Sequence, residues 1–380
     1  MDLIRQYTRK DYNSSSPVMG KAERVIFAFL LPFLIINAGA TAYNPVLADE
    51  TSKTVNYSKE QRVTQEYETN ALASLPDKGD NLLQAMAAIA DPARHGILGS
   101  ISSDEVSVLC RIRNMGPVLV SKGEFLTVVS PREPLSKSFK PWDMVKIINA
   151  EVPSRTDIDL LLNREAYLAL RDMVSFINSH RHSNGAHYEL RVQSAYRSPG
   201  TQRGVFNRKV DGILKKNPGM SRQEAERLAA RVVAPPYETE HALGFTVDFT
   251  TGKQLKHDSD PLTNRFGETP EGQMLAKEGW KYGWVNSLMP GKEKITGRET
   301  ELWYWRYVGF PHSEIMKKYN WIPEEYRNYM QEKRSILFES ETGRLYWVYF
   351  DQDTGRACAV ELKQKTTQVA MFPGSNAFSK

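Results

Sequence analysis

The chain has 380 residues, of which 41% are hydrophobic and 25% are charged, and its formal net charge is +5 at pH 7. This composition is ordinary for globular domains, and it excludes a collagen-like chain, a coiled-coil rod, a disulfide-dense small protein and a polytopic membrane protein. The mild charge, with no dense Lys/Arg block and no known nucleic-acid motif, argues against a nucleic-acid partner.

Residues 1–43 predict a secretory signal peptide or an N-terminal membrane anchor. Two basic residues, Lys21 and Arg24, precede the uncharged run VIFAFLLPFLII, and the small-x-small sequence ATA follows it. These are the features of a signal peptide, but the uncharged stretch 25–43 is also long enough to span a bilayer. Because the basic flank precedes the apolar run, both alternatives place the rest of the chain outside the cytoplasm. If it is not removed, this stretch would contact the cytoplasmic membrane.

Polar residues dominate 44–80, which predicts a stalk or linker. Residues 81–115 predict a helical and β segment ahead of the main domain, with a short helix at LLQAMAAIA. The sequence from 105 to 130 is β-like, because Gly and Pro separate short apolar segments. Two cysteines, Cys110 and Cys358, are far apart and cannot form a cysteine-based zinc site alone. They would pair in an oxidising compartment or remain buried free thiols, and the sequence leaves both alternatives open.

Periodicity gives further elements along the chain. Apolar residues recur at three and four positions over 157–179, which predicts an amphipathic helix, and the segment YELRVQSAYRS after it predicts a strand. Residues 206–234 predict a charged helical insertion, in which Ser221 and Glu224 would form a capping box. A loop-rich stretch to about 295 leads into an aromatic strand, ELWYWRYVGF, and then helical segments. The last part, 335–380, alternates strands with Gly-bearing turns and predicts a small antiparallel meander of about four strands.

Polar residues that could bind a metal ion occur in a short motif. His241 and Asp248 flank a Gly-containing turn and a strand, in the sequence EHALGFTVD. A turn of this kind allows both side chains to converge on one cation. Imidazole plus carboxylate suits zinc, which needs three protein ligands and one open position in a catalytic site. The spacing alone is also compatible with a histidine on the surface and an aspartate at a strand end that have no role in metal binding.

The motifs SAYRS…Q, EHxxGxxxD and ExWxxRYVG, in this order, resemble the D-alanyl-D-alanine carboxypeptidases of the VanY type. The upstream segments PLSKSFKPWDMVKI and NREAYLALRDMV and the downstream segment VGFPHSEIMKKYNWIPEEY extend the resemblance over about 116–330. It implies an α+β fold, shared with the hedgehog signalling domain, over 116–334: a central, mostly antiparallel sheet with flanking helices. It also implies a monomeric, zinc-dependent peptidase outside the cytoplasm, which acts on the D-alanyl-D-alanine end of peptidoglycan stem peptides.

The resemblance also implies roles for single residues. His241 and Asp248 would be zinc ligands, and Glu301 would be the general base. Arg197 would bind the terminal carboxylate of the substrate. The residues implied to contact the substrate are Arg197, Ser194, Gln202 and Trp303.

One position departs from the family pattern. The third metal ligand of the family is a histidine directly after the tryptophan of its ExWH motif, and here that position is Tyr304. Three outcomes remain open. Tyr304 ligates zinc as a phenolate whose pKa the cation lowers; His257 or His312 supplies the third ligand; or the metal site is lost and the pocket binds peptide without cutting it.

Overall fold

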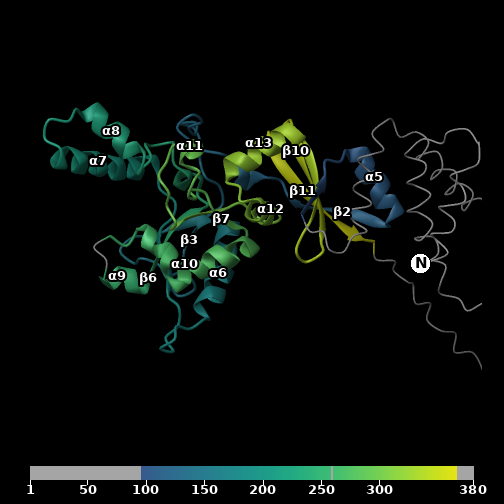
Figure 1. Cartoon of the computed structure of the whole chain (residues 1–380), viewed down its shortest axis with the longest axis horizontal. Coiled ribbons are helices and arrows are strands. Elements are labelled where there is room, and N and C mark those ends of the chain that lie inside the picture. Colours follow the sequence, from purple (N-terminus) through teal and green to yellow (C-terminus); the bar gives the residue numbers. More distant parts are fainter. Residues whose placement is uncertain (1–95, 258–259, 366–380) are drawn as a thin grey trace, which may run out of the picture. The chain divides into compact units, whose positions relative to one another are not determined.

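The computed structural model describes residues 96–257 and 260–365 (Figure 1). Helices and antiparallel sheets mix along this part of the chain, so the predicted α+β class is confirmed. Helix α5 (Ser103–Ile112) belongs largely to a separate contact unit and is described by itself. None of the helices within the described ranges is long and apolar enough to cross a membrane. The predicted span 25–43 and stalk lie outside these ranges, and the domain boundaries stay predictions.

The sheet that carries the motifs has four strands in the order β5-β6-β8-β7, and every pair is antiparallel. The strands are β5 (Leu190–Ser194), β6 (Thr246–Thr251), β7 (Trp284–Asn286) and β8 (Tyr304–Tyr307). In the register of this sheet, Ser194 pairs with Asp248, and Asp248 pairs with Tyr304. Three residues of the predicted site therefore form one row across three neighbouring strands.

Helix α6 (Arg164–Asn178) packs against this sheet with a face of residues three and four apart. Its buried side chains include Leu170, Val174 and Ile177, which share the core with strand residues. The side chain of Asn163 accepts hydrogen bonds from the first backbone amides of the helix, which is why α6 begins later than the predicted start at 157. The residues just before it form β4 (Leu161–Asn163), which pairs with β3 (Met144–Lys146).

The predicted C-terminal meander is present as β9 (Ser335–Glu339), β10 (Leu345–Asp351) and β11 (Arg356–Gln364). Two earlier strands, β1 (Gly96–Gly99) and β2 (Met115–Ser121), complete a five-stranded sheet in the order β1-β9-β10-β11-β2. The C-terminal strands therefore share their sheet with residues from the start of the described chain. The expected fourth C-terminal strand lies outside the described residues.

Two sequence predictions for local structure were wrong. The β-like segment VSVLCRIR lies in helix α5, because Val106, Leu109 and Cys110 also fit the helical spacing of three and four. Acidic residues in its first turn and Arg111 in its last turn complement the helix dipole. The stretch before 295 is also less loop-rich than predicted. It contains α9 (Gly252–His257), α10 (Pro270–Glu278), α11 (Glu293–Thr296), η4 (Asn264–Glu268) and η5 (Gly279–Tyr282).

Two helices make up the charged insertion, α7 (Pro199–Lys216) and α8 (Arg222–Ala230). They pack on each other around a small core of Val210, Ala225 and Ala229, at the left of Figure 1. Ser221 caps α8 by accepting a hydrogen bond from the backbone of Glu224, which is one half of the predicted capping box; no bond from the Glu224 side chain to the Ser221 backbone is formed. Helices α12 (His312–Tyr319) and α13 (Pro323–Lys333) follow β8. Cys110 and Cys358 are both free and buried.

Candidate active site

A short 3-10 turn, η3 (Glu240–Leu243), positions His241 ahead of strand β6. The hydroxyl of Thr239 accepts a hydrogen bond from the backbone amide of His241 and starts the turn. Gly244 ends it with a φ of +86°, and a β-carbon there would lie 2.7 Å from Sδ of Met144. The positive φ and this close approach both require glycine. The chain can therefore reverse tightly between His241 and the strand that bears Asp248.

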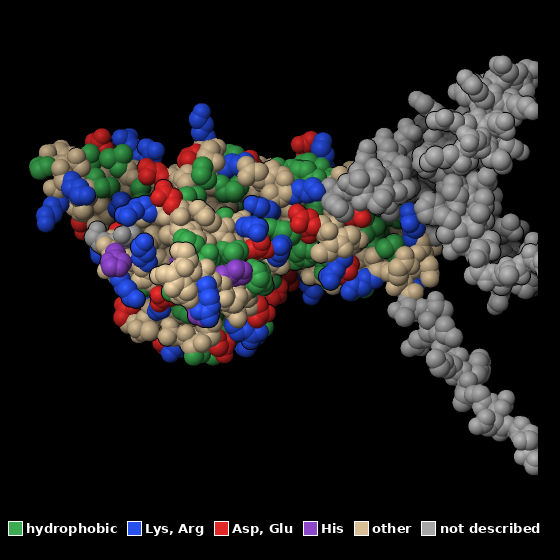
Figure 2. All heavy atoms as spheres, turned by 60° about the horizontal axis from the view of Figure 1, so that its bottom comes forward, with side chains coloured by type: hydrophobic (Ala, Val, Ile, Leu, Met, Phe, Trp, Pro, Cys, Tyr) green, Lys and Arg blue, Asp and Glu red, His purple; other side chains and the backbone are tan. Residues whose placement is uncertain are grey.

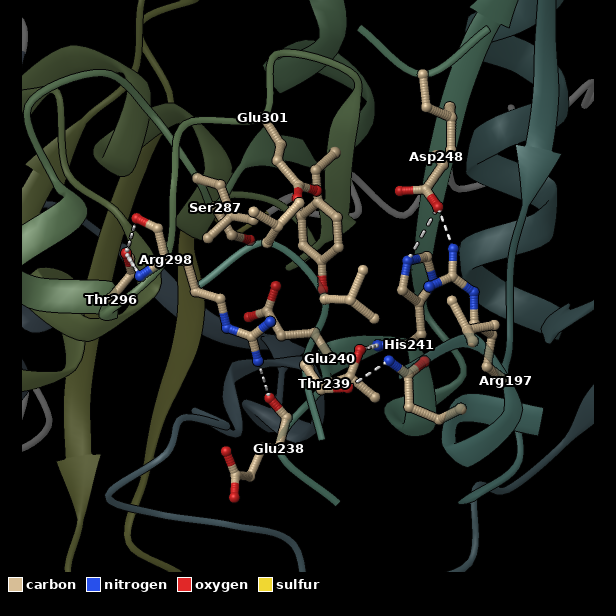
Figure 3. Close-up of a pocket in the computed structure, with 18 of the residues that line it drawn as sticks. Arg197, Glu238, Thr239, Glu240, His241, Asp248, Ser287, Thr296, Arg298 and Glu301 are labelled. Carbon is tan, nitrogen blue, oxygen red and sulfur yellow. Dashed lines mark hydrogen bonds and ion pairs between the residues drawn. The ribbon is translucent and has the colours of Figure 1, made fainter. Parts of the chain in front are cut away.

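His241 and Arg197 meet on one carboxylate oxygen of Asp248 (Figure 3). Nε2 of His241 lies 3.2 Å from Oδ2 of Asp248, and Nη2 of Arg197 lies 2.5 Å from the same oxygen. Nδ1 of His241 lies 2.7 Å from the carbonyl oxygen of Ala195, which can only accept, so Nδ1 carries a proton. The contact between Nε2 and Oδ2 therefore needs a second proton on the ring or a cation between the two atoms.

This geometry tests whether the residues fit zinc. Ligand atoms at ~2.0–2.1 Å from a tetrahedral zinc lie roughly 3.3 Å apart, close to the observed separation of the His241 and Asp248 atoms. An imidazole whose other nitrogen donates to a backbone carbonyl is the usual state of a metal-binding histidine. Oδ1 of Asp248 is buried without a hydrogen-bond partner. Two ligand positions therefore fit, although no group of three His, Cys, Asp or Glu that could hold a metal occurs within 96–257 and 260–365.

Charge keeps Asp248 ionised. Burial acts to raise its pKa, but the charges of His241 and Arg197 and the hydrogen bonds from His241 and Ser194 outweigh burial and hold the pKa below its usual range. Arg197 also donates from Nε to Oγ of Ser194 at 2.8 Å. The arginine predicted to bind the substrate carboxylate thus has two of its donor groups engaged within the protein.

Glu301 lines the same cavity just before β8, with its backbone fixed on both sides. Its amide donates to the carbonyl of Leu288, and its carbonyl accepts from the side chain of Asn286. Burial, together with the negative charge of Asp248, raises the pKa of the Glu301 carboxyl to about 8. A carboxyl with this pKa can hold or release a proton near neutral pH, which is what a general acid–base group needs.

Tyr304 stands next to the histidine, with its ring edge-on to that of His241 and the centroids 5.2 Å apart. It is buried, and burial together with the charges of Glu240 and Asp248 raises the pKa of its phenol well above the usual value. Without a cation beside it, Tyr304 is therefore a neutral phenol, which is a weak metal ligand.

The two alternative third ligands do not join the pair. His312 is fully buried elsewhere, with Nδ1 2.8 Å from the hydroxyl of Tyr326 and Nε2 2.9 Å from Oγ of Ser121. Burial lowers the pKa of His312 to about 3, so it stays neutral. His257 ends helix α9, and no metal-binding group within the described residues includes it.

A cavity of about 550 Å³ collects these residues. Two other predicted residues lie in its wall. Gln202 is 1% exposed and donates from Nε2 to the carbonyl of Ala234, while its Oε1 has no partner. Trp303 is partly buried and packs on the core. The cavity thus brings together all the predicted site residues except Ser194, which contacts it through Arg197: Arg197, Gln202, His241, Asp248, Glu301, Trp303 and Tyr304.

Sequence reasoning missed a buried ion pair beneath the site. Nη1 of Arg306 lies 2.5 Å from Oε1 of Glu240, and the same guanidinium donates to the backbone carbonyls of Phe125 and Thr127. Arg306 has no exposed surface. Both residues lie inside the motifs: Glu240 directly precedes His241, and Arg306 stands two positions after Tyr304. Their place in the motifs was the available signal. Four further cavity residues gave no signal: Glu238, Ser287, Arg298 and Glu324.

Comparison with known proteins identifies the domain. Residues 159–310 match the model of the VanY family, described as D-alanyl-D-alanine carboxypeptidase. The chain carries a VanY-type domain. This confirms the resemblance carried by the motifs, and the roles of the single residues stay predictions.

Relatives of the VanY-type domain include a D-alanyl-D-alanine carboxypeptidase of Enterococcus faecium, 32% identical over 125 residues. That match covers 33% of this chain and 38% of the relative, so the chain spans well under half of its length. A bifunctional D-Ala-D-Ala dipeptidase and carboxypeptidase of Enterococcus gallinarum is 26% identical over 205 residues, 54% of this chain and 94% of that protein. Among solved structures, the LdcB LD-carboxypeptidase is 27% identical with a TM-score of 0.44, covering 55% of this chain and 88% of that one.

Proposed function

We propose that this protein is a zinc-dependent peptidase that hydrolyses the D-alanyl-D-alanine end of peptidoglycan stem peptides. One observation carries the proposal: the carboxyl of Glu301, with a pKa of about 8, shares a cavity with the His241–Asp248 pair. The names of the relatives support the choice of substrate. We also propose that the protein acts outside the cytoplasm, where its substrate lies.

His241 and Asp248 would hold the zinc ion. When bound, zinc would polarise the scissile carbonyl and supply a nucleophile at neutral pH. A carboxylate oxygen of Glu301 would accept the proton of the attacking water and pass it to the leaving amine. A cation near Asp248 would offset the negative charge that raises the pKa of Glu301, and so would favour the ionised carboxylate that this role requires.

The second candidate function is binding of wall peptides without cleavage. Tyr304 favours it, because a buried neutral phenol stands where the family places its third zinc ligand. In this case Arg197 and the cavity would still bind the peptide.

Zinc content and turnover separate the two candidates. Purified protein is assayed for bound zinc and for release of D-alanine from a stem pentapeptide. Stoichiometric zinc, with turnover that Glu301→Ala abolishes, supports the peptidase. Absence of zinc and turnover, with peptide binding that Arg197→Met removes, supports the binding module. Trypsin accessibility of the domain on intact cells tests the proposed location.

A further inference from the structure

Acidic and basic side chains both line the cavity of the VanY-type domain. Its lining includes six carboxyl groups and two arginines outside α7: Glu238, Glu240, Asp248, Asp260, Glu301, Glu324, Arg197 and Arg298. Helix α7 forms another part, with Gln202, Val205, Arg208 and Lys209. Val205, Arg208 and Lys209 lie three, six and seven positions after Gln202, which places all four on one face of the helix. An anionic group of a ligand would therefore be attracted to the cations of α7.

Two cations of α7, Arg208 and Lys209, form no ion pair with any residue of 96–257 or 260–365. Within the described residues, neither Arg208 nor Lys209 forms an ion pair or donates a hydrogen bond to a carboxylate, whereas Arg222 and Arg227 on the neighbouring helix α8 do. Both side chains are exposed at the mouth of the cavity. Figure 2 shows several Lys and Arg side chains at this end of the molecule, where α7 and α8 lie. The two cations are therefore available to a ligand.

The guanidinium of Arg208 lies over the preceding turn of α7. A β-carbon at Gly204 would lie 3.6 Å from Nη1 of Arg208, so the arginine lies along the helix toward its N-terminal end, where Arg197 and Ser198 precede α7. The charge of Lys209 lowers the pKa of Glu301 against the larger effect of burial. Both cations line the cavity that also contains Glu301.

The distance of Arg208 and Lys209 from Gln202 along α7 determines which part of a bound peptide they would contact. Gln202, whose Oε1 is buried without a partner, lines the cavity together with His241 and Asp248 and would accept an amide N–H of a peptide bound there. Lys209 lies seven positions further on, or roughly 10 Å along the helix axis. An extended peptide covers that distance in about three residues.

We propose that Arg208 and Lys209 form a second carboxylate-binding site, which recognises a free carboxylate about two to three residues upstream of the cleaved bond. The inference rests on the proposed function only in taking a wall peptide as the ligand. It names the substrate class more narrowly: stem peptides in which the second residue, a glutamate linked through its side chain, keeps its main-chain carboxylate free rather than amidated.

The test compares two acetylated pentapeptides that end in D-alanyl-D-alanine. One contains γ-linked D-glutamate and the other contains its amidated counterpart, isoglutamine. Binding is measured by calorimetry with zinc present, in a Glu301→Gln background that suppresses turnover. We expect the free acid to bind about tenfold more tightly, as a charge-assisted contact would give. The double change Arg208→Gln with Lys209→Gln should reduce the ratio of affinities below twofold.

A matched control uses Lys215→Gln with Lys216→Gln, since these residues stand in the last turn of the same helix and are not among those lining the cavity. This pair of changes should leave the ratio intact. A ratio near one in the parent, a ratio that survives the loss of Arg208 and Lys209, or failure of both peptides to bind would overturn the proposal. Failure of the proposed hydrolysis is read separately, as absence of D-alanine release by the unmodified protein.

Discussion

Arg197 donates a 2.5 Å hydrogen bond from Nη2 to Oδ2 of Asp248, the same oxygen that faces Nε2 of His241. The carboxylate is buried, so the arginine neutralises a charge that would otherwise be costly in the protein interior. A metal ion held by His241 and Asp248 would take over this neutralisation. The state of Arg197 is therefore linked to the occupancy of the metal site.

The first prediction concerns Arg197→Met. In the presence of a chelator we expect the free energy of unfolding to fall by about 3 kcal/mol, because Asp248 loses its cationic partner while it stays buried. Excess zinc should recover most of the loss. Urea denaturation with and without zinc measures both effects, and Arg203→Met, on an exposed site of α7, serves as control. Equal midpoints for the variant and the parent in chelator would contradict the prediction.

The second prediction concerns Tyr304, which pairs with Asp248 in the register of β6 and β8. Tyr304→His places an imidazole in the row that already contains the carboxylate, and a third strong ligand should raise zinc affinity by at least about tenfold. Tyr304→Phe keeps the ring and removes only the hydroxyl. Competition with a chromophoric chelator measures both variants. If affinity falls in both of them, the hydroxyl of Tyr304 is itself a ligand, and the assignment as a weak neutral phenol fails.

The residues of the row Ser194–Asp248–Tyr304 could be predicted from the sequence. The motifs occur in the order of the family, and each one specifies a strand and the polar residue at its end. The side-chain partners could not be predicted in this way. Sequence spacing gives no sign that Arg197 turns onto Asp248, since that contact depends on rotamers and on the approach of two strands. Helix α5 was misread for a different reason: its apolar residues satisfy the periods of a strand and a helix together, and local pattern alone cannot separate them.

The third prediction concerns the ion pair below the site. Arg306→Met should lower the free energy of unfolding by about 3–5 kcal/mol, because it leaves the buried Glu240 and the carbonyls of Phe125 and Thr127 without their donor. Chemical denaturation measures the change. Arg298 provides the comparison, since its guanidinium donates to one backbone carbonyl, that of Glu238, and is less buried. We therefore expect Arg298→Met to cost clearly less, and an equal cost would refute the special role of the buried pair.

The fourth prediction follows from the raised pKa of Glu301. The folded protein binds this proton up to a pH of about 8, whereas an unfolded glutamate releases it near its model value of 4.5. The contribution of the protonated carboxyl to stability is therefore complete below about pH 4.5 and is lost as the pH rises toward 8. Glu301→Gln carries no charge and avoids this loss. In chelator, the variant should match the parent near pH 4.5 and exceed it by on the order of a few kcal/mol at pH 8.5.

Thermal unfolding across this pH range, with Glu268→Gln as the exposed control, tests the sign directly. A gap between Glu301→Gln and the parent that does not widen from pH 4.5 to 8.5 would mean that the pKa of Glu301 is not raised in the folded protein, because a raised folded-state pKa makes the gap grow as the pH rises. Zinc sharpens the same measurement. A cation beside Asp248 lowers the pKa of Glu301, so the gap at pH 8.5 should shrink when zinc replaces the chelator. That change reports metal binding next to Glu301 even if no peptide is cut.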